Sequence, residues 1–492
     1  MKSKKLLLSA ILVAILTSSF IGHLLVGAQN PVIKVGVLLD VAVTEGLALQ
    51  GAINVADWWV NGPGGGIVIG GVRYDLQFIT ANEHAAEGRP DLAAQEAERL
   101  ITESGVDFLV GTSLSECGRA VEEVCADYQK IFIHPGCVDD DLIDCGTGTC
   151  GHCVRCDYNR YKYIFRLATN STIVGLGTFG YLQYLIESKL VRIYGSPVKT
   201  AVLFEDLDWT EVPYNYIVYG GALGPHAEIV YHARTPFTCD DFSSYLDGIK
   251  ASGAHLIVVL YYLPNSITLV RQFYEYPGHI PALMAGVVVP AQVQEFWDQT
   301  LGECQYLITL NSAGGRTPII TEPAPITTIE FYDKFVELNG YSPAWNAYTF
   351  FNIIYAMKQT LETAGIQPPL DAAKSSALIP YIEQYEGLGI LGKSKFTGPH
   401  PMDPSQYPYL SVNPTMKGTL HDTFMNEIGP TWAQGYVRIF VLQWIDGKRM
   451  VISPIDQLYS KKTQIPTWMY ELSDVDLNFD GEVNILDIIT IG

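Results

Sequence analysis

Basic side chains are scarce in this sequence. The 492 residues include 31 Lys and Arg against 52 Asp and Glu, a formal net charge of −21. Because nucleic-acid binding needs a concentrated positive field, this balance argues against nucleic acid as the principal partner. Charged residues make up only 17% of the chain and hydrophobic residues 48%, which excludes a largely disordered protein and supplies apolar material for more than one core.

Long apolar runs are also rare, since only Leu6 to about Val26 approaches the length of a membrane span. Lysines precede this run, and the small residues up to Ala28 suit cleavage by a signal peptidase before Gln29. We therefore predict a signal peptide over residues 1–28, with an uncleaved membrane anchor as the alternative. The remainder is expected to be secreted or extracytoplasmic, in the periplasm or at the cell surface.

Cysteines are few but unevenly placed. Five of the nine crowd into one segment, at Cys137, Cys145, Cys150, Cys153 and Cys156. Because thiols oxidise outside the cell, we expect disulfides to crosslink this segment, and zinc bound at Cys150, Cys153 and Cys156 is the alternative. The sequence leaves the pairing open, and the odd number of cysteines means that at least one pairs elsewhere or stays reduced.

From Pro31 onward, short β-branched runs alternate with amphipathic helical stretches, which is typical of βαβ units. This pattern predicts an α/β fold with two doubly wound parallel-sheet lobes. The expected strands lie at 32–39, 108–110 and 131–134 in one series, and at 200–204, 228–231, 255–260 and 282–285 in the other. Open parallel sheets bind ligands beyond the carboxyl ends of their strands, so two facing lobes predict a cleft for a small molecule.

Several short phrases occur in a specific order between residues 31 and about 460. They are Val35–Leu39 with Gly51, Asn61–Gly71, Ala93–Ile101, Val110–Ser115, Phe165–Arg166, Pro343–Gly365 and Gln443–Lys448. Together they resemble the type 1 periplasmic binding proteins, in particular the leucine/isoleucine/valine-binding family. The resemblance implies a substrate-binding protein whose two lobes close over a small-molecule solute, such as an amino acid, and present it to an ABC permease in the membrane.

The resemblance also implies a division of the chain. One lobe would comprise 31–166 with about 305–400, and the other 167–304 with about 401–453. A linker would follow at 454–470, ahead of a short separate tail at 471–492.

Family members hold a ligand carboxylate with hydroxyls and backbone N–H groups at loop ends of the first lobe. Ser115 matches the first of these positions, although a Ser before a helix also serves as an ordinary N-cap. At the second position the family's hydroxyl residue is replaced by Val138, which leaves the backbone donors of Gly136 and Cys137.

On the second lobe the family uses aromatic contacts and, for amino acids, a carboxylate. Trp209 and Tyr262 match the aromatic positions, with ordinary packing as the alternative. No acidic residue occurs at 286–290, so an ammonium group would have to pair with Asp206 or Asp208. The expected solute is therefore an amino acid, an amide, or a urea-like, nucleobase-like or aromatic compound.

Enzyme chemistry has weak support. Ser115, His134 and the acidic run Asp139–Asp141 contain the residue types of a hydrolytic triad, but no Gly-x-Ser-x-Gly elbow is present. We predict a binding protein rather than an enzyme, and no organic cofactor.

The tail carries a separate pattern. Asp476, Asn478, Asp480, the carbonyl of Glu482, Asn484 and Asp487 fit the calcium-ligating positions of an EF-hand loop, with Gly481 at its turn. This repeat resembles half of a dockerin and predicts bound Ca²⁺, with a cohesin-like partner or self-association through the tail. Two alternatives to transport stay open: a ligand-sensing receptor of the same fold, and a surface assembly protein that acts through its tail.

Overall fold

The computed structural model describes residues 30–145, 151–311, 325–396, 421–423, 440–453 and 463–466, together with Met469. The predicted signal peptide, Cys150, most of the linker and the calcium-binding tail lie outside these residues. Within the described part of the chain, no helix combines the length and the apolar character that crossing a membrane requires.

The first lobe is built on a six-stranded sheet in the order β2-β3-β1-β4-β5-β6. All neighbours are parallel except the β2/β3 hairpin. The strands are β1 (Val32–Leu39), β2 (Ile67–Ile69), β3 (Val72–Asn82), β4 (Phe108–Gly111), β5 (Phe132–His134) and β6 (Ile164–Arg166). Helices α2 (Thr44–Asn61), α3 (Pro90–Thr102) and α4 (Ser115–Asp127) follow β1, β3 and β4, and the short α5 (Tyr158–Tyr161) precedes β6.

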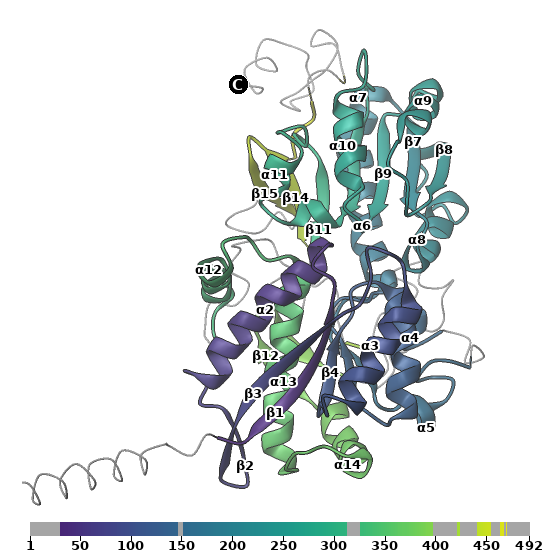
Figure 1. Ribbon diagram of the computed structural model, residues 1–492. Coiled ribbons are helices and arrows are strands. Elements are labelled where there is room, and N and C mark those ends of the chain that lie inside the picture. The colour runs from purple at the N-terminus through teal and green to yellow at the C-terminus, as the bar shows by residue number, and fades with distance from the viewer. Residues whose placement is uncertain are drawn as a thin grey trace, which may run out of the picture.

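The second lobe is built on a seven-stranded sheet in the order β15-β14-β11-β10-β9-β7-β8. Its parallel strands are β7 (Val198–Glu205), β8 (Ala227–Thr235), β9 (Leu256–Tyr261), β10 (Leu283–Val288) and β11 (Ile308–Asn311). Among the helices of this lobe are α6 (Ser171–Leu185), α7 (Val191–Tyr194), α8 (Asp208–Val218), α9 (Ser243–Ser252), α10 (Ser266–Tyr274) and α11 (Phe296–Gln299). Figure 1 shows this lobe stacked above the first.

After β11 the chain returns to the first lobe, where α12 (Thr328–Asn339) and α13 (Trp345–Ala364) pack beside α2 (Figure 1). Gly51 allows this approach, because a side chain there would collide with the ring of Phe335. The lobe is completed by α14 (Ala372–Glu383) and the hairpin of β12 (Glu386–Gly389) and β13 (Gly392–Lys395).

The chain then enters the second sheet again as an antiparallel hairpin, β14 (Phe440–Ile445) and β15 (Lys448–Ser453), which pairs with β11. The predicted α/β class is confirmed, but the second sheet is mixed rather than wholly parallel. The predicted lobe boundary near 305 also differs from the sheet pairing, because β11 at Ile308–Asn311 pairs in parallel with β10 of the second sheet.

One crossing between the lobes is anchored at the end of β6. The guanidinium of Arg166 is fully buried and donates from Nε and one terminal nitrogen to the two carboxylate oxygens of Asp422, at 2.8 and 2.6 Å. The backbone N–H of Arg166 donates to the carbonyl of His421. Residues 421–423 therefore lie against the first lobe, although the sequence assigned about 401–453 to the second.

Candidate functional site

A cavity of about 50 Å³ lies between the lobes. A single water needs roughly 10–15 Å³ on the same measure, so the space admits a small molecule. It opens where strands β4 and β5 of the first sheet and β9, β10 and β11 of the second reach their carboxyl ends, which is where open parallel sheets place their ligands. The lining residues are Glu45, Ser113, Gly136, Val138, Thr169, Val174, Trp209, Tyr262, Val287, Val289, Gln292, Leu310, Asn311 and Trp345.

Most of this lining is apolar. The apolar part of the wall has two components. Aliphatic side chains after β5, on α6 and along β10 and β11 form one, and the aromatic rings of Trp209, Tyr262 and Trp345 form the other. All three aromatic residues are buried. Among the described residues, no Lys, Arg or His lines the cavity. Such a surface favours a solute with an apolar or aromatic body and a small number of polar groups.

One hydrogen bond joins the lobes across the cavity. The hydroxyl of Tyr262, which follows β9, lies 2.7 Å from Oγ of Ser113, which follows β4. Glu83 holds Ser113 from behind by accepting its backbone N–H at 2.7 Å and bonding to its hydroxyl. Burial raises the pKa of Glu83 to about 8, so this carboxyl keeps its proton at neutral pH.

The carboxyl group that lines the cavity belongs to Glu45, in the first turn of α2. Its side chain accepts the indole N–H of Trp345, and its backbone carbonyl accepts Asn346 Nδ2 at 2.8 Å. Burial raises the pKa of Glu45 well above its ordinary value. A protonated Glu45 therefore presents a neutral hydrogen-bonding group to the cavity, on the first lobe.

Gln292 lines the same cavity and offers a hydrogen-bond acceptor. Its amide nitrogen donates to the carbonyl of Leu310 at 3.0 Å. Its amide oxygen is buried and has no partner among the described residues. Leaving a buried acceptor unpaired is unfavourable, so this oxygen is suited to accept an N–H or O–H group of a bound solute.

The periplasmic binding protein family matches residues 32–400 of the chain. The chain belongs to the periplasmic binding protein family. Membership implies an extracytoplasmic location and a role in binding. No curated protein matches the sequence.

Solved structures of solute receptors share the fold. A putative branched-chain amino acid ABC transporter protein from Silicibacter pomeroyi is 18% identical, with a TM-score of 0.63 over 89% of this chain and 100% of its own. A solute-binding protein from R. palustris, in complex with benzoate, is 14% identical, with a TM-score of 0.61 over 88% and 98%. A leucine-binding protein from Thermotoga maritima is 14% identical, with a TM-score of 0.60 over 87% and 100%. At these identities the likeness shows the fold alone.

Three of the predicted ligand-binding residues line the cavity of this family member, namely Gly136, Trp209 and Tyr262. Ser115 does not. It begins α4, its hydroxyl accepts the backbone N–H of Asp139 at 3.2 Å, and the N-cap position is occupied by Leu114. The hydroxyl that reaches the cavity is that of Ser113. Thr112 has a positive φ of 46°, so the backbone turns just before Ser113.

Cys137 also lies outside the lining. Its side chain is fully buried, 2.9 Å from Oγ1 of Thr112, and donates to the carbonyl of Leu114. It therefore packs against the β4 loop instead of facing the cleft.

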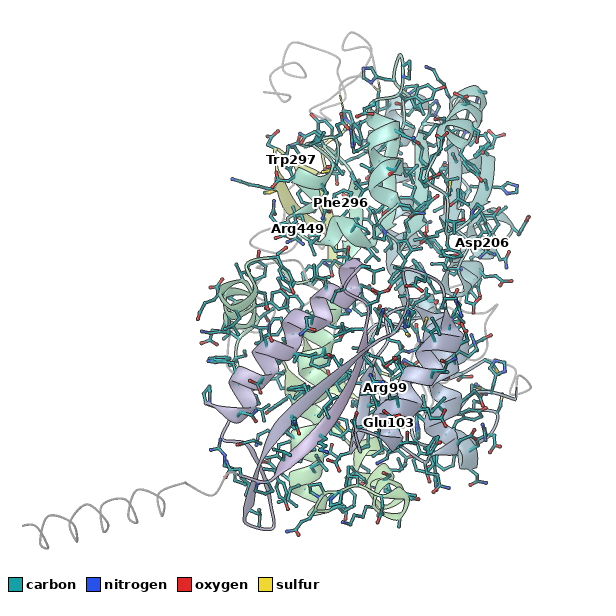
Figure 2. The ribbon with its side chains drawn as sticks, in the orientation of Figure 1. Arg99, Glu103, Asp206, Phe296, Trp297 and Arg449 are labelled. Atoms are coloured by element: carbon teal, nitrogen blue, oxygen red, sulfur yellow. The ribbon has the colours of Figure 1, made fainter. Side chains whose placement is uncertain are left out.

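The predicted acidic residues of the second lobe have partners at the surface. Asp206 pairs with Arg234 at 2.8 Å and is 58% exposed, and Figure 2 shows it at the outer margin of the lobe. Asp208 begins α8, where it lies 3.7 Å from Arg119 of the first lobe. Neither carboxylate lines the cavity, so the acidic group available to a solute is Glu45, which sequence reasoning missed.

The residues of the hydrolytic alternative have other partners. His134 is fully buried with Nε2 2.6 Å from Glu122 Oε1. Burial raises the pKa of Glu122 and lowers the pKa of His134, so the pair is neutral. Among the described residues, the hydroxyl of Ser115 contacts the backbone of Asp139 and the imidazole of His134 contacts Glu122, so no hydrogen bond joins this serine to the histidine.

Proposed function

We propose that this protein is the solute-binding receptor of an ABC importer and captures a small, mainly apolar solute by closure of its two lobes. The observation that carries the proposal is the cavity between the strand ends of both lobes, spanned by the Ser113–Tyr262 hydrogen bond. A contact of this kind exists only when the lobes are closed. A solute that touches both walls would stabilise the closed state by its differential affinity for it.

The lining narrows the solute class. Apolar and aromatic walls suit an aromatic or branched aliphatic body. A protonated Glu45 can donate to a carbonyl or similar acceptor, and the amide oxygen of Gln292 can accept from an N–H or O–H group. We therefore favour an uncharged amide or an aromatic compound carrying a neutral polar group. The benzoate held by the R. palustris protein shows that an aromatic body is compatible with this fold.

An α-amino acid is the competing solute. Its ammonium group would need a carboxylate, and Glu45 supplies one only if it releases its proton, which costs free energy at neutral pH. The two solute classes therefore predict opposite pH dependences. Affinity for an acceptor solute falls as Glu45 ionises at high pH, whereas affinity for an ammonium solute rises.

A binding panel tests the proposal. The mature protein, without residues 1–28, is screened by thermal unfolding against amides, aromatic acids and alcohols, nucleobases, urea and amino acids. A solute at 100 times its Kd adds about 2.7 kcal/mol to stability. We expect a selective shift with an amide or aromatic compound, retained in Glu45→Gln. An unchanged melting temperature across the panel, in protein confirmed free of prebound solute, would contradict the proposal.

Transport itself needs a second measurement. A strain that imports the identified solute through the cognate permease should lose uptake when this receptor is deleted and regain it on complementation. Unchanged uptake in the deletion strain would contradict the transport role while leaving solute binding intact.

A further inference from the structure

Three sulfur atoms converge in the segment that joins β5 to α5. Sγ of Cys156 lies 3.1 Å from Sγ of Cys145 and 3.3 Å from Sγ of Cys153. All three sulfurs lie within 4.8 Å of one another, and no other group of three or more potential metal ligands is as compact within the described ranges. None of the three cysteines lines the interlobe cavity, so this cluster is separate from the solute site.

The backbone around the cluster is held by its own hydrogen bonds. The N–H groups of Cys156 and Asp157 donate to the carbonyl of Cys153 at 3.0 and 3.1 Å, which closes a turn across Cys-Val-Arg-Cys. The N–H of Arg155 donates to the carbonyl of Ile143, and its guanidinium pairs with Asp144 at 3.0 Å. These contacts bring Ile143 and Asp144, and with them the adjacent Cys145, beside the turn.

The chain between β5 and α5 is a long connection in which a crosslink would contribute stability. It runs from 135 to 157, and its described residues contain one short 3-10 turn, Asp140–Leu142, as their only helix or strand. Loops of this length without regular structure are uncommon in compact domains. A link that joins its distant parts restricts the unfolded chain and so stabilises the folded one.

The arrangement of the sulfurs bears on whether a disulfide or a metal ion forms the crosslink. A disulfide joins two sulfurs, whereas three converge here: the turn brings Cys153 close to Cys156, and Cys145 approaches Cys156 from a separate stretch of the chain. Thiolates prefer soft or borderline cations, and zinc is commonly bound by several of them. Zinc–sulfur bonds of about 2.3 Å require sulfurs roughly 3.8 Å apart, so a small expansion of the cluster accommodates the ion.

Burial and charge fit the same conclusion. Cys153 is fully buried, and Cys145 and Cys156 are half-buried, so a bound ion would be shielded on one side and reachable from the other. Asp144 and Arg155, which neighbour Cys145 and Cys156 in the sequence, neutralise each other in an ion pair at 3.0 Å, so the negative charge that a bound cation would meet comes from the thiolates themselves.

We propose that Cys145, Cys153 and Cys156 bind one Zn²⁺ ion through their sulfur atoms and that the ion holds Cys145 to the turn formed by Cys153 and Cys156. Binding converts each thiol to a thiolate and releases its proton to solvent. The metal also protects these cysteines from oxidation, which in this compartment would otherwise join them as disulfides.

Metal analysis of the whole mature protein tests the proposal. The protein is produced with export, purified in the presence of zinc and freed of loosely bound ions. We expect one zinc ion per chain in the wild type, less than a tenth of that in Cys153→Ser, and the full amount in Cys239→Ser. Cys239 is the matched control because it lies in the second lobe, where its thiol donates to the carbonyl of Asp241. Full zinc content in Cys153→Ser would overturn the proposal.

A second measurement avoids substitutions, since Cys153→Ser could lower zinc content simply by misfolding. Cobalt(II) added to the metal-free wild type should produce the intense sulfur-to-cobalt charge-transfer absorption of a thiolate site, and zinc should displace it. Absence of that absorption, together with a disulfide between two of the three cysteines in the peptide map of protein isolated without reductant, would overturn the proposal. These outcomes do not depend on whether a solute binds in the cleft.

Discussion

Replacing Tyr262 with Phe removes one atom from the contact that joins the two lobes. The Tyr262 hydroxyl lies 2.7 Å from Ser113 Oγ, and both side chains are buried. Phe keeps the aromatic ring that lines the cavity, so the substitution isolates the hydrogen bond. We expect the solute-free protein to open more often than the wild type.

The size of the effect follows from the environment of the bond. A net intramolecular hydrogen bond contributes about 0.5–1.5 kcal/mol, and about 1.4 kcal/mol changes an equilibrium constant tenfold. The ratio of closed to open protein should therefore fall roughly two- to tenfold. For a solute that binds only the closed state, Kd should rise by no more than the same factor.

Single-molecule energy transfer between dyes on the two lobes measures the two populations directly. Tyr261→Phe is the matched control, because the neighbouring Tyr261 hydroxyl is also buried but bonds to Thr235 Oγ1 at 2.9 Å within the second lobe. We expect this variant to lose stability against unfolding while its distribution of open and closed protein stays unchanged. An unchanged distribution in Tyr262→Phe, or equal opening in both variants, would mean that the Ser113–Tyr262 hydrogen bond does not hold the lobes closed.

Three further predictions concern charge. The pKa of Glu83 is about 8 when folded against about 4.5 in a free chain, so the folded protein holds a proton that the unfolded chain releases between these values. Glu83 therefore lowers the free energy of unfolding by up to about 1.4 kcal/mol for each pH unit of increase between these values. Glu83→Gln should remove this contribution, which urea unfolding at several pH values between 5 and 8 measures. Asp422→Ala should cost about 3–5 kcal/mol in the same assay, because it leaves the buried Arg166 cation unpaired. Asp476→Ala with Asp480→Ala should abolish calcium binding in titration calorimetry without changing the melting temperature of the lobes.

A specific experimental result would contradict each of these three predictions. An unaltered pH slope in Glu83→Gln would mean that this carboxyl is ionised in the folded protein. Asp206→Ala is the control for Asp422, since its pair with Arg234 lies at the surface and should contribute no more than about 1 kcal/mol. Equal losses in both variants would contradict the buried ion pair, and an undiminished calcium titration in the double variant would remove the EF-hand assignment.

The strands of both lobes could be predicted because buried parallel strands are continuous apolar runs. The predicted strand at 255–260, for example, corresponds to β9 at Leu256–Tyr261, whose residues are all buried. The β14/β15 hairpin was not predicted as part of a sheet. Its pairing with β11 joins segments more than 100 residues apart, and no local pattern specifies a partner at that distance.

The cleft could be predicted as a region but not residue by residue. Ser113 and Ser115 both follow β4, and the backbone turn at Thr112 determines that Ser113 reaches the cavity. The acidic group was missed for a different reason. Glu45 becomes part of the site only because the start of α2 meets Trp345 at the start of α13, 300 residues away in the sequence.

Once the panel has identified a solute, equilibrium binding to two tryptophan variants shows whether the solute is held in the cavity between the lobes. Trp209 lines the cavity, whereas Trp297 stacks on Trp444 on the opposite margin of the second lobe from Asp206 (Figure 2). Loss of a buried aromatic contact costs at least about 2 kcal/mol, so we expect Kd to rise roughly thirtyfold or more in Trp209→Ala and to stay unchanged in Trp297→Ala. Wild-type affinity in Trp209→Ala would contradict solute capture between the lobes.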